Sequence, residues 1–327
     1  MNNENIEVTV YCLAFNHERY IRKALEGFVN QKTNFRYQVI VHDDASTDKT
    51  SEIIEEYYLN YPDLIVPIFQ KENQYSQNVN IVSTYIAPLI KGKYIAVCEG
   101  DDYWCNEYKL QKQFDIMESN DTYSACVHNT QVIDLSSGKK TIKYPCNGCY
   151  VLNTVDVLQR GSEKFHTSSL FYRQEYLILP ERYQIPSIGD YSKAIYLATV
   201  GNIYYISDVM SVYRKNVPGA WSTRQNNGTR YNIAQKSIKV LKAADKDTNY
   251  RYHLDIEQII RRKEFYSLLY HEDYKGVINQ YSDLLSKELS SNERIKIYIK
   301  SYIPYVNSIY KAIRNIFDKS HHERKKQ

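Results

Sequence analysis

The chain has 327 residues, of which 43% are hydrophobic and 24% are charged, so it can bury a sizeable core and form one or two domains. Its net charge of +4 at pH 7 is too small to indicate a nucleic-acid partner, and we expect none. The sequence has no run of about 18 apolar residues and no signal-peptide pattern, so we expect neither a membrane-spanning nor an exported protein.

Strand and helix patterns alternate through the first 120 residues, as in a parallel sheet with crossover helices. We expect Asn16 to cap the first helix, Ser46 or Thr47 to cap the second, and Pro62 to end the second helix. The predicted strands are 6–13, 37–41, 64–69 and 94–98, and the predicted helices are 17–30, 46–60, 79–90 and 107–119.

The alternation becomes irregular after Thr122. The sequence SSGKK at 136–140 predicts a hairpin turn, and strands near 164–172 and 203–213 flank a helix that begins at Asp190. Composition shifts near Gly228, and the remaining chain is largely helical. We therefore predict one domain over 1–228, with halves at 1–120 and 121–228, and a helical region over 229–327.

The six cysteines are scattered along the chain, several of them in or beside apolar segments, and we expect buried free thiols in a reducing cytosol. Cys146 and Cys149 alone lie close together, in the sequence CNGC. This pair would suit half of a zinc site or a redox pair, but no second pair follows at metal-ligand spacing. The alternative is a tight Asn-Gly turn between two strands.

Two acidic clusters follow predicted parallel strands. Asp43 and Asp44 come after the second strand, and Glu99, Asp101 and Asp102 come after the fourth. The carboxyl ends of such strands form the edge at which open α/β sheets bind ligands. Carboxylates this close repel one another unless a cation lies between them, which favours a hard divalent metal that also binds substrate phosphates. The alternative for either cluster alone is a solvated turn or helix cap.

Three segments in this order resemble motifs of the inverting family 2 glycosyltransferases: VTVYCLAFNHERYIRKALEGFVNQ, VIVHDDASTDKT, and CEGDDYW followed by YKLQKQ. The resemblance is dense over residues 6–120 and thin from there to about residue 222. It implies the GT-A fold, a Rossmann-like and mostly parallel α/β sheet flanked by helices, with a nucleotide-binding half and an acceptor-binding half. It also implies inverting transfer of a sugar from a nucleotide diphosphate donor, with Mn²⁺ or Mg²⁺ as cofactor.

The resemblance assigns donor-binding roles to single residues. Leu13 and Phe15 lie where the family contacts the nucleobase, and Asp44 matches the acid that hydrogen-bonds the base. Glu99 and Asp101 match the two acids of the metal-binding DXD motif, with Glu99 in place of the usual first Asp. Asp101 is the better candidate for direct or water-mediated metal contact.

Further donor roles fall on residues that follow these motifs. Asp102 matches a residue that touches the donor sugar or the ribose. Arg214 and Trp221 resemble parts of a loop that closes over the diphosphate, where Arg214 neutralises charge and Trp221 excludes water. Relatives often carry a metal-binding His two residues after this Arg, and the present chain has Asn216 there.

On the acceptor side, Asp190 follows Gly189 where the family has a Glu-Asp pair, and in family members the Asp of that pair is the general base. From the residues alone, a role as a helix cap explains Asp190 equally well. His166 and Arg173 lie in a segment that resembles the strand beneath the acceptor site, and they are secondary acceptor-site candidates. A structural role is the alternative for His166.

The C-terminal region carries a separate pattern. From residue 295 to 317 apolar residues recur at helical spacing, basic residues such as Lys300 and Arg314 occupy the other face, and a basic tail follows. This pattern suits an anionic membrane surface, where a lipid-linked acceptor resides, so we expect a cytoplasmic protein peripherally bound to the inner face of a bacterial plasma membrane. The alternative is a helix that packs within a homodimer or against the domain, and Pro304 would split the helix.

Three functions follow from these features. The first is glycosyl transfer, from a UDP-sugar to a growing surface polysaccharide or a lipid-linked oligosaccharide. The second is an inactive scaffold that binds sugar or nucleotide with the same fold. The third is a sugar-phosphate nucleotidyltransferase, which needs a Gly-rich, basic loop after the first strand, and residues 13–16 do not form one.

Overall fold

The computed structural model describes residues 5–145, 148–218 and 227–302. Chain contacts divide these residues into two compact units. One unit lies within Met1–Arg224 and Lys239–Ile256, and the other within Gln225–Ile238 and Glu257–Gln327. The domain boundary predicted at residue 228 remains a prediction.

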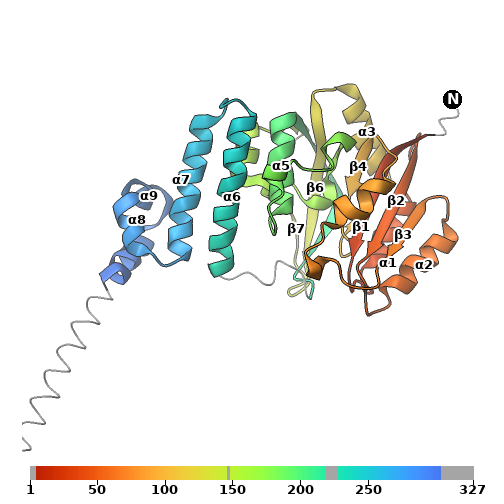
Figure 1. Ribbon diagram of the computed structural model, residues 1–327, viewed down its shortest axis with the longest axis horizontal. Helices are drawn as coiled ribbons and strands as arrows, with labels where there is room; N and C mark the ends of the chain where they lie inside the picture. The colour runs from red at the N-terminus through yellow and green to blue at the C-terminus, as the bar shows by residue number, and fades with distance from the viewer. Residues whose placement is uncertain (1–4, 146–147, 219–226, 303–327) are drawn as a thin grey trace, which may run out of the picture. The chain divides into compact units, whose positions relative to one another are not determined.

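A mixed, mostly parallel sheet runs through the first unit in the order β3-β2-β1-β4-β9-β6-β10-β5 (Figure 1). The β1–β2, β2–β3, β1–β4 and β6–β10 pairs are parallel, whereas β9 runs antiparallel to both of its neighbours, β4 and β6. The strands of this path are β1 (Ile6–Ala14), β2 (Arg36–Asp43), β3 (Ile65–Phe69), β4 (Tyr94–Val97), β5 (Tyr103–Trp104), β6 (Tyr123–Asp134), β9 (Phe171–Arg173) and β10 (Asn202–Lys215).

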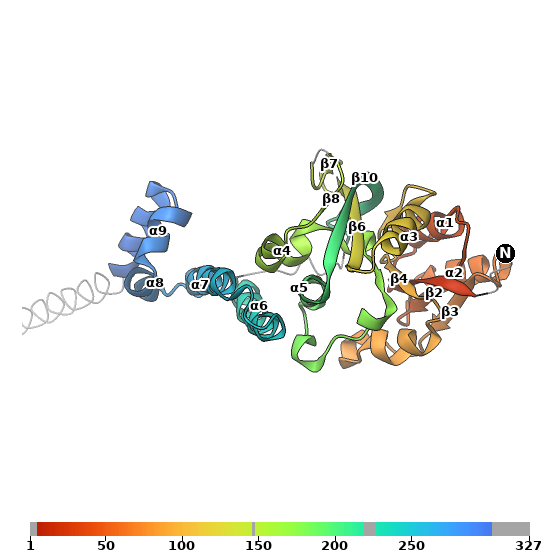
Figure 2. The ribbon, with the colours of Figure 1, turned by 90° about the horizontal axis from the view of Figure 1, so that it is seen from above.

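Helices cover both faces of this sheet. Successive side chains of a buried strand point to opposite faces, so apolar side chains on each face pack against helices. Val8 and Val10 of β1 belong to a hydrophobic cluster shared with α1 (Ile21–Val29), α2 (Thr50–Asn60) and α3 (Lys109–Ser119). Figure 2 shows α1 and α3 together beside the strands. Tyr11, between Val10 and Cys12, belongs instead to a second cluster with residues of α4 (Thr154–Arg160) and α5 (Gly189–Val200). Two buried layers therefore fix the strand ends at the carboxyl edge.

Most predicted elements of this unit are confirmed within a few residues, including the end of α2 two residues before Pro62. The hairpin at SSGKK is also confirmed, because β7 (Lys140–Ile142) pairs antiparallel with β6. The predicted helix at 79–90 was wrong in type: Val82–Ile86 is a π turn and Ala87–Leu89 a 3₁₀ turn, with Pro88 unable to supply an α-helical N–H. The predicted strand at 164–172 consists largely of 3₁₀ turns, and only β9 at its end pairs as a strand.

The predicted helix caps were wrong, because these side chains join two loops instead. The N-cap positions of α1 and α2 are Tyr20 and Lys49, neither of which makes a side-chain capping bond. The Oδ1 atom of Asn16 accepts the Thr47 N–H at 2.8 Å, and Ser46 Oγ accepts the Asn16 N–H at 2.8 Å. The loop after β1 is thus bonded directly to the loop after β2, at the edge that carries the acidic clusters.

Helices make up the rest of the described chain: α6 (Asn227–Asp247), α7 (His253–Tyr270), α8 (Tyr274–Gln280), α9 (Ser282–Glu288) and a helical segment over 291–302. In the second unit, Phe265, Val277, Leu285 and Ile297 form their own hydrophobic cluster. None of the helices within the described ranges has the length and hydropathy needed to cross a membrane.

The five cysteines within the described residues are free thiols. Cys12, Cys98 and Cys126 are buried as expected, whereas Cys105 and Cys149 are exposed. The structure does not describe Cys146, so the turn and metal-site interpretations of CNGC remain predictions.

Candidate active site

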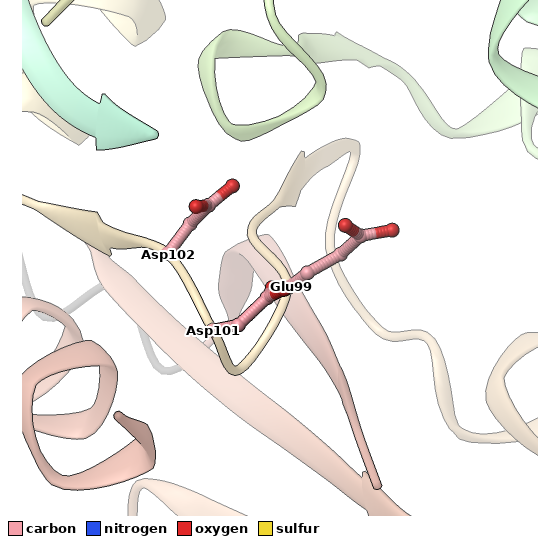
Figure 3. A group of neighbouring side chains, drawn as sticks. All are labelled: Glu99, Asp101 and Asp102. Carbon is pink, nitrogen blue, oxygen red and sulfur yellow. The ribbon is translucent and has the colours of Figure 1, made fainter. Parts of the chain in front are cut away.

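A tight loop after β4 gathers three acids. Glu99, Asp101 and Asp102 each offer a carboxylate oxygen, and these oxygens lie within 4.8 Å of one another (Figure 3). Gly100 has no room for a side chain, since a Cβ there would lie 2.8 Å from His17 Nδ1 and 2.9 Å from Ile21 Cδ1. The loop therefore lies directly against the start of α1, and its backbone brings the flanking acids together.

Asp102 is buried and held by β10. Its Oδ1 atom accepts the backbone N–H of Arg214 at 2.9 Å. Arg214 Nη1 in turn donates to the carbonyl oxygen of Asp101 at 2.6 Å, and the guanidinium lies 4.6 Å from the ring centroid of Tyr103. Burial and the charge of Asp101 raise the pKa of Asp102 well above its usual range. Arg214 thus bonds to two consecutive residues of the acidic loop and places a fixed positive charge beside it.

The acids fit a hard divalent cation. Burial, followed by the charges of Asp101 and Asp190, raises the pKa of Glu99 to about 8, although water reaches this side chain. A cation among these oxygens would remove the repulsion that helps to raise the pKa values of Glu99 and Asp102. Mg²⁺ or Mn²⁺ accepts a few carboxylate oxygens while leaving positions for phosphate.

Asn216 occupies the position at which relatives often carry a metal-binding His, but its side chain bonds to a hairpin of the sheet. Its φ of +64° places it in a turn after β10. Its side-chain amide donates to Asp134 Oδ1 at 3.0 Å, at the hairpin between β6 and β7. Asn216 therefore supports the hairpin in this structure.

Asp190 lies in the first turn of α5 but does not cap the helix, because the N-cap position is Ile188. The protein around Asp190 raises the pKa of this acid although water reaches its side chain, and the Thr167 hydroxyl and the Lys143 ammonium oppose that shift. Its charge also raises the pKa of Glu99. The fold thus brings Asp190 close to the acidic loop, although the two are far apart in the sequence.

The predicted base-binding residues lie at the same edge. Leu13 is half-buried and Phe15 is 43% exposed, both at the end of β1. Asp44 is buried, and its two oxygens accept the N–H groups of Gln74 at 2.7 Å and Tyr75 at 3.0 Å. Each carboxylate oxygen has a second lone pair, so Asp44 keeps the capacity to accept from a base. The roles of these three residues remain predictions.

His166 also lies beside the acidic loop, but its geometry does not suit a general base. Its Nδ1 atom accepts the backbone N–H of Ser168 at 3.2 Å, and its ring stacks on Tyr213 with centroids 4.3 Å apart. Burial and the Lys143 charge lower the pKa of His166 well below its usual range, so the 3.7 Å approach to Asp102 is not an ion pair. A neutral ring whose Nδ1 already accepts a hydrogen bond has no free site for a proton.

Two other candidates do not join this group. Arg173 pairs with Tyr94 at the start of β4, at the edge of the sheet opposite the acidic loop, and its guanidinium donates to Tyr123 O at 2.9 Å. The structure therefore gives Arg173 a packing role away from the predicted acceptor site. Trp221 lies outside the described residues. Sequence reasoning missed Lys143, because a lysine near the end of a polar hairpin carries no motif.

A family model described as Glycosyl transferase family 2 matches residues 9–174, just over half of the chain. The chain belongs to glycosyltransferase family 2. This result confirms the family predicted from the three motifs, and it places both acidic clusters inside the matched region.

Curated relatives extend the likeness. The uncharacterized protein Rv1520 of Mycobacterium tuberculosis is 33% identical over 219 residues, which cover 65% of this chain and 60% of that protein. The chain thus spans about 60% of the length of this relative. The uncharacterized glycosyltransferase alr2836 of Nostoc sp. is 27% identical over 220 residues, covering 64% of this chain and 65% of that protein.

A solved structure supports the fold. TarS 1–349 of S. aureus, in complex with UDP-GlcNAc, superposes with a TM-score of 0.58 over 90% of this chain and 79% of that chain. Sequence identity is 16%, so this likeness shows the fold alone. The GT-A fold predicted from the sequence is confirmed.

Proposed function

We propose that this protein is an inverting, metal-assisted glycosyltransferase. It would move a sugar from a nucleotide diphosphate donor, a UDP-sugar, to a hydroxyl of a growing surface polysaccharide or lipid-linked oligosaccharide. The observation that carries the proposal is the cluster of Glu99, Asp101 and Asp102 at the carboxyl edge of a family 2 sheet, with Asp190 near enough for its charge to act on Glu99. The UDP-GlcNAc bound to TarS, a protein of the same fold, supports the choice of a UDP-sugar.

On the donor side, Asp101 and Glu99 would hold the cation, which supplies a Lewis acid for the departing diphosphate, and Asp102 in the same cluster would touch the donor sugar or the ribose. Arg214 adds a positive charge that is already fixed by Asp101 and Tyr103. Because this charge needs no rearrangement, it stabilises negative charge that develops on the leaving oxygen.

On the acceptor side, Asp190 is the proposed general base. The acceptor oxygen forms a bond to the anomeric carbon from the face opposite the diphosphate, and the bond to the diphosphate oxygen breaks. The hydroxyl proton passes to the Asp190 carboxylate, and the configuration at the anomeric carbon inverts. The Thr167 hydroxyl and the Lys143 charge favour the ionised carboxylate that this step requires.

Nucleotide specificity is tested by a melting-temperature screen against UDP-, GDP- and dTDP-sugars, with and without Mn²⁺. We expect only UDP-sugars with Mn²⁺ to stabilise the protein, by about 2.7 kcal/mol when the ligand is at 100 times its Kd. Release of UDP from the stabilising donor separates an enzyme from an inactive scaffold. Release of pyrophosphate from UTP and a sugar phosphate would instead indicate a nucleotidyltransferase.

We also propose an anionic membrane surface as a partner of the C-terminal region. Within the described residues, Ile295, Tyr298, Ile299 and Tyr302 are 44–62% exposed and follow one another at helical spacing. Lys296 and Lys300 lie between them in the sequence, which matches a basic amphipathic helix. The continuation of the pattern beyond residue 302 lies outside the described residues.

Replacing both Ile295 and Ile299 by Glu is expected to reduce binding to vesicles that contain anionic lipid at least about tenfold, because apolar contact and charge attraction are both weakened. Co-sedimentation with anionic and neutral vesicles measures this effect. Substitution is a sharper test than truncation, since the buried Ile297 packs with Phe265 and its loss would open that cluster. If the double variant changes the oligomeric state and leaves vesicle binding intact, the helix is a protein interface.

A further inference from the structure

Hydrogen bonds to β6 fix the backbone at Lys143. Its backbone N–H donates to Thr130 O at 2.9 Å, next to β7. The buried Asn129 side chain donates to Tyr144 O at 2.7 Å and accepts the Tyr144 N–H at 3.2 Å. These bonds hold residues 143 and 144 against the buried strand β6. The start of the Lys143 side chain is therefore fixed by the sheet.

The ammonium group lies near two aromatic rings and has no close counterion among the described residues. Its Nζ atom is 5.3 Å from the ring centroid of Tyr144 and 5.7 Å from that of Tyr213. Within the described part of the chain, Lys143 forms no ion pair of 4.0 Å or less, whereas Lys164 pairs with Asp156 at 2.7 Å. Burial lowers the pKa of Lys143, while the more distant charges of Glu163, Asp102 and Asp190 oppose that shift.

A half-buried cation without a counterion costs stability unless a ligand completes its surroundings. The two tyrosine faces offset part of this cost, but a ring face provides no oxygen acceptor. None of the three acids that act on Lys143 pairs with it within 4.0 Å: Asp102 accepts from Arg214, Asp190 is the proposed base, and Glu163 is an exposed acid farther away. An oxyanion that arrives with a substrate would satisfy the Lys143 ammonium.

The rings near Lys143 belong to the predicted acceptor-binding half, and the charge of Lys143 acts on Asp190. Arg214, in contrast, is bonded to the acidic loop that serves the donor. We propose that Lys143 binds an oxyanion of the acceptor, so that the acceptor class is a saccharide with a phosphate or carboxylate near its reactive hydroxyl. This inference rests on the proposed glycosyltransferase function.

The surrounding charges would also orient such an acceptor. Asp190, Asp102 and Glu163 repel an anion, whereas Lys143 attracts it. The oxyanion would therefore lie at Lys143 and leave the uncharged hydroxyl beside Asp190. Lys143 would then determine both how tightly the acceptor binds and how the bound acceptor is oriented.

Three small probes test the proposal on the full chain saturated with UDP and Mn²⁺: methyl β-D-glucuronide, glycerol 1-phosphate and the neutral methyl β-D-glucoside. We expect one charged probe to bind on the order of tenfold more tightly than the neutral probe in an NMR titration. The glucuronide and the glycerol phosphate distinguish a carboxylate from a phosphate. Lys143→Met should remove this preference, and Lys143→Arg should keep most of it.

Lys140→Met, on the exposed side of the same hairpin, is the matched control and should bind every probe like the wild type. Equal binding of charged and neutral probes by the wild type would overturn the inference, as would a loss of UDP affinity in Lys143→Met with probe binding intact. If Lys143→Met does not fold, the same titrations on Lys143→Gln, together with the preference of the wild type for charged probes, test the proposal. The UDP titration tests the proposed function separately from the probes. If the wild type does not bind UDP, the proposed function itself is refuted.

Discussion

Replacing Asp190 by Asn is expected to lower turnover roughly 10²-fold or more while leaving the melting temperature and the affinity for UDP unchanged. Asn has nearly the same shape and still accepts a hydrogen bond, but it cannot take a proton at neutral pH. Because Ile188 and not Asp190 occupies the N-cap of α5, the substitution removes no capping bond. Steady-state kinetics, thermal melting and a UDP titration measure the three quantities.

A matched control separates catalysis from the favourable effect of an acid near a helix N-terminus. Asp156 lies in the first turn of α4 and pairs with Lys164, so Asp156→Asn removes a comparable charge outside the acidic group. We expect near-normal turnover from that variant. Near-normal turnover in Asp190→Asn as well would refute its role as the base, and the proton would then need another acceptor.

Replacing Asp101 by Asn is expected to weaken Mn²⁺-dependent binding of UDP at least about tenfold, because it removes one of the charges that hold the cation. The protein without metal should be no less stable, since the substitution also removes repulsion from Asp102 and Glu99. The backbone carbonyl of residue 101, which accepts from Arg214, is kept. Isothermal titration with UDP, in Mn²⁺ and in EDTA, measures the effect.

The titration in EDTA is the internal control, because binding without metal should match the wild type. Asp121→Asn provides a second control, since Asp121 is a fully exposed acid close to Arg173 and away from this edge. Equal Mn²⁺-dependent affinity in Asp101→Asn and the wild type would contradict the assignment of a metal site to this loop.

The features that the sequence predicted well are those that neighbouring residues determine. Asp44 and the Glu99–Asp102 loop each follow a strand directly, so locating β2 and β4 also located the acids. The parallel pairing of β1 with β2 and β4 then brought both acidic clusters to one edge. Local pattern and strand direction were sufficient for these features.

The features that the sequence did not predict depend on contacts between distant residues. The pairing of β9 with β4 places Arg173 at the opposite edge of the sheet. The pattern of one strand does not specify how that strand aligns with its neighbour. We predicted Asn16 as a helix cap because an Asn just before a helix usually bonds to the backbone of that helix. Its partner here is instead Thr47, in another loop. Lys143 becomes part of the site only because the hairpin returns along β6 toward Tyr213.

The bonds between the loops after β1 and β2 have a kinetic consequence. Beyond the contacts of Asn16, the His17 N–H donates to Thr50 Oγ1 at 2.8 Å and the Glu18 N–H donates to Asp48 at 3.0 Å. On the proposed assignment, a nucleoside that binds here meets two loops that are already bonded to each other, so little ordering entropy of these loops opposes binding. Its association should then proceed in one step, at a rate that rises linearly with nucleotide concentration and without a slow isomerisation.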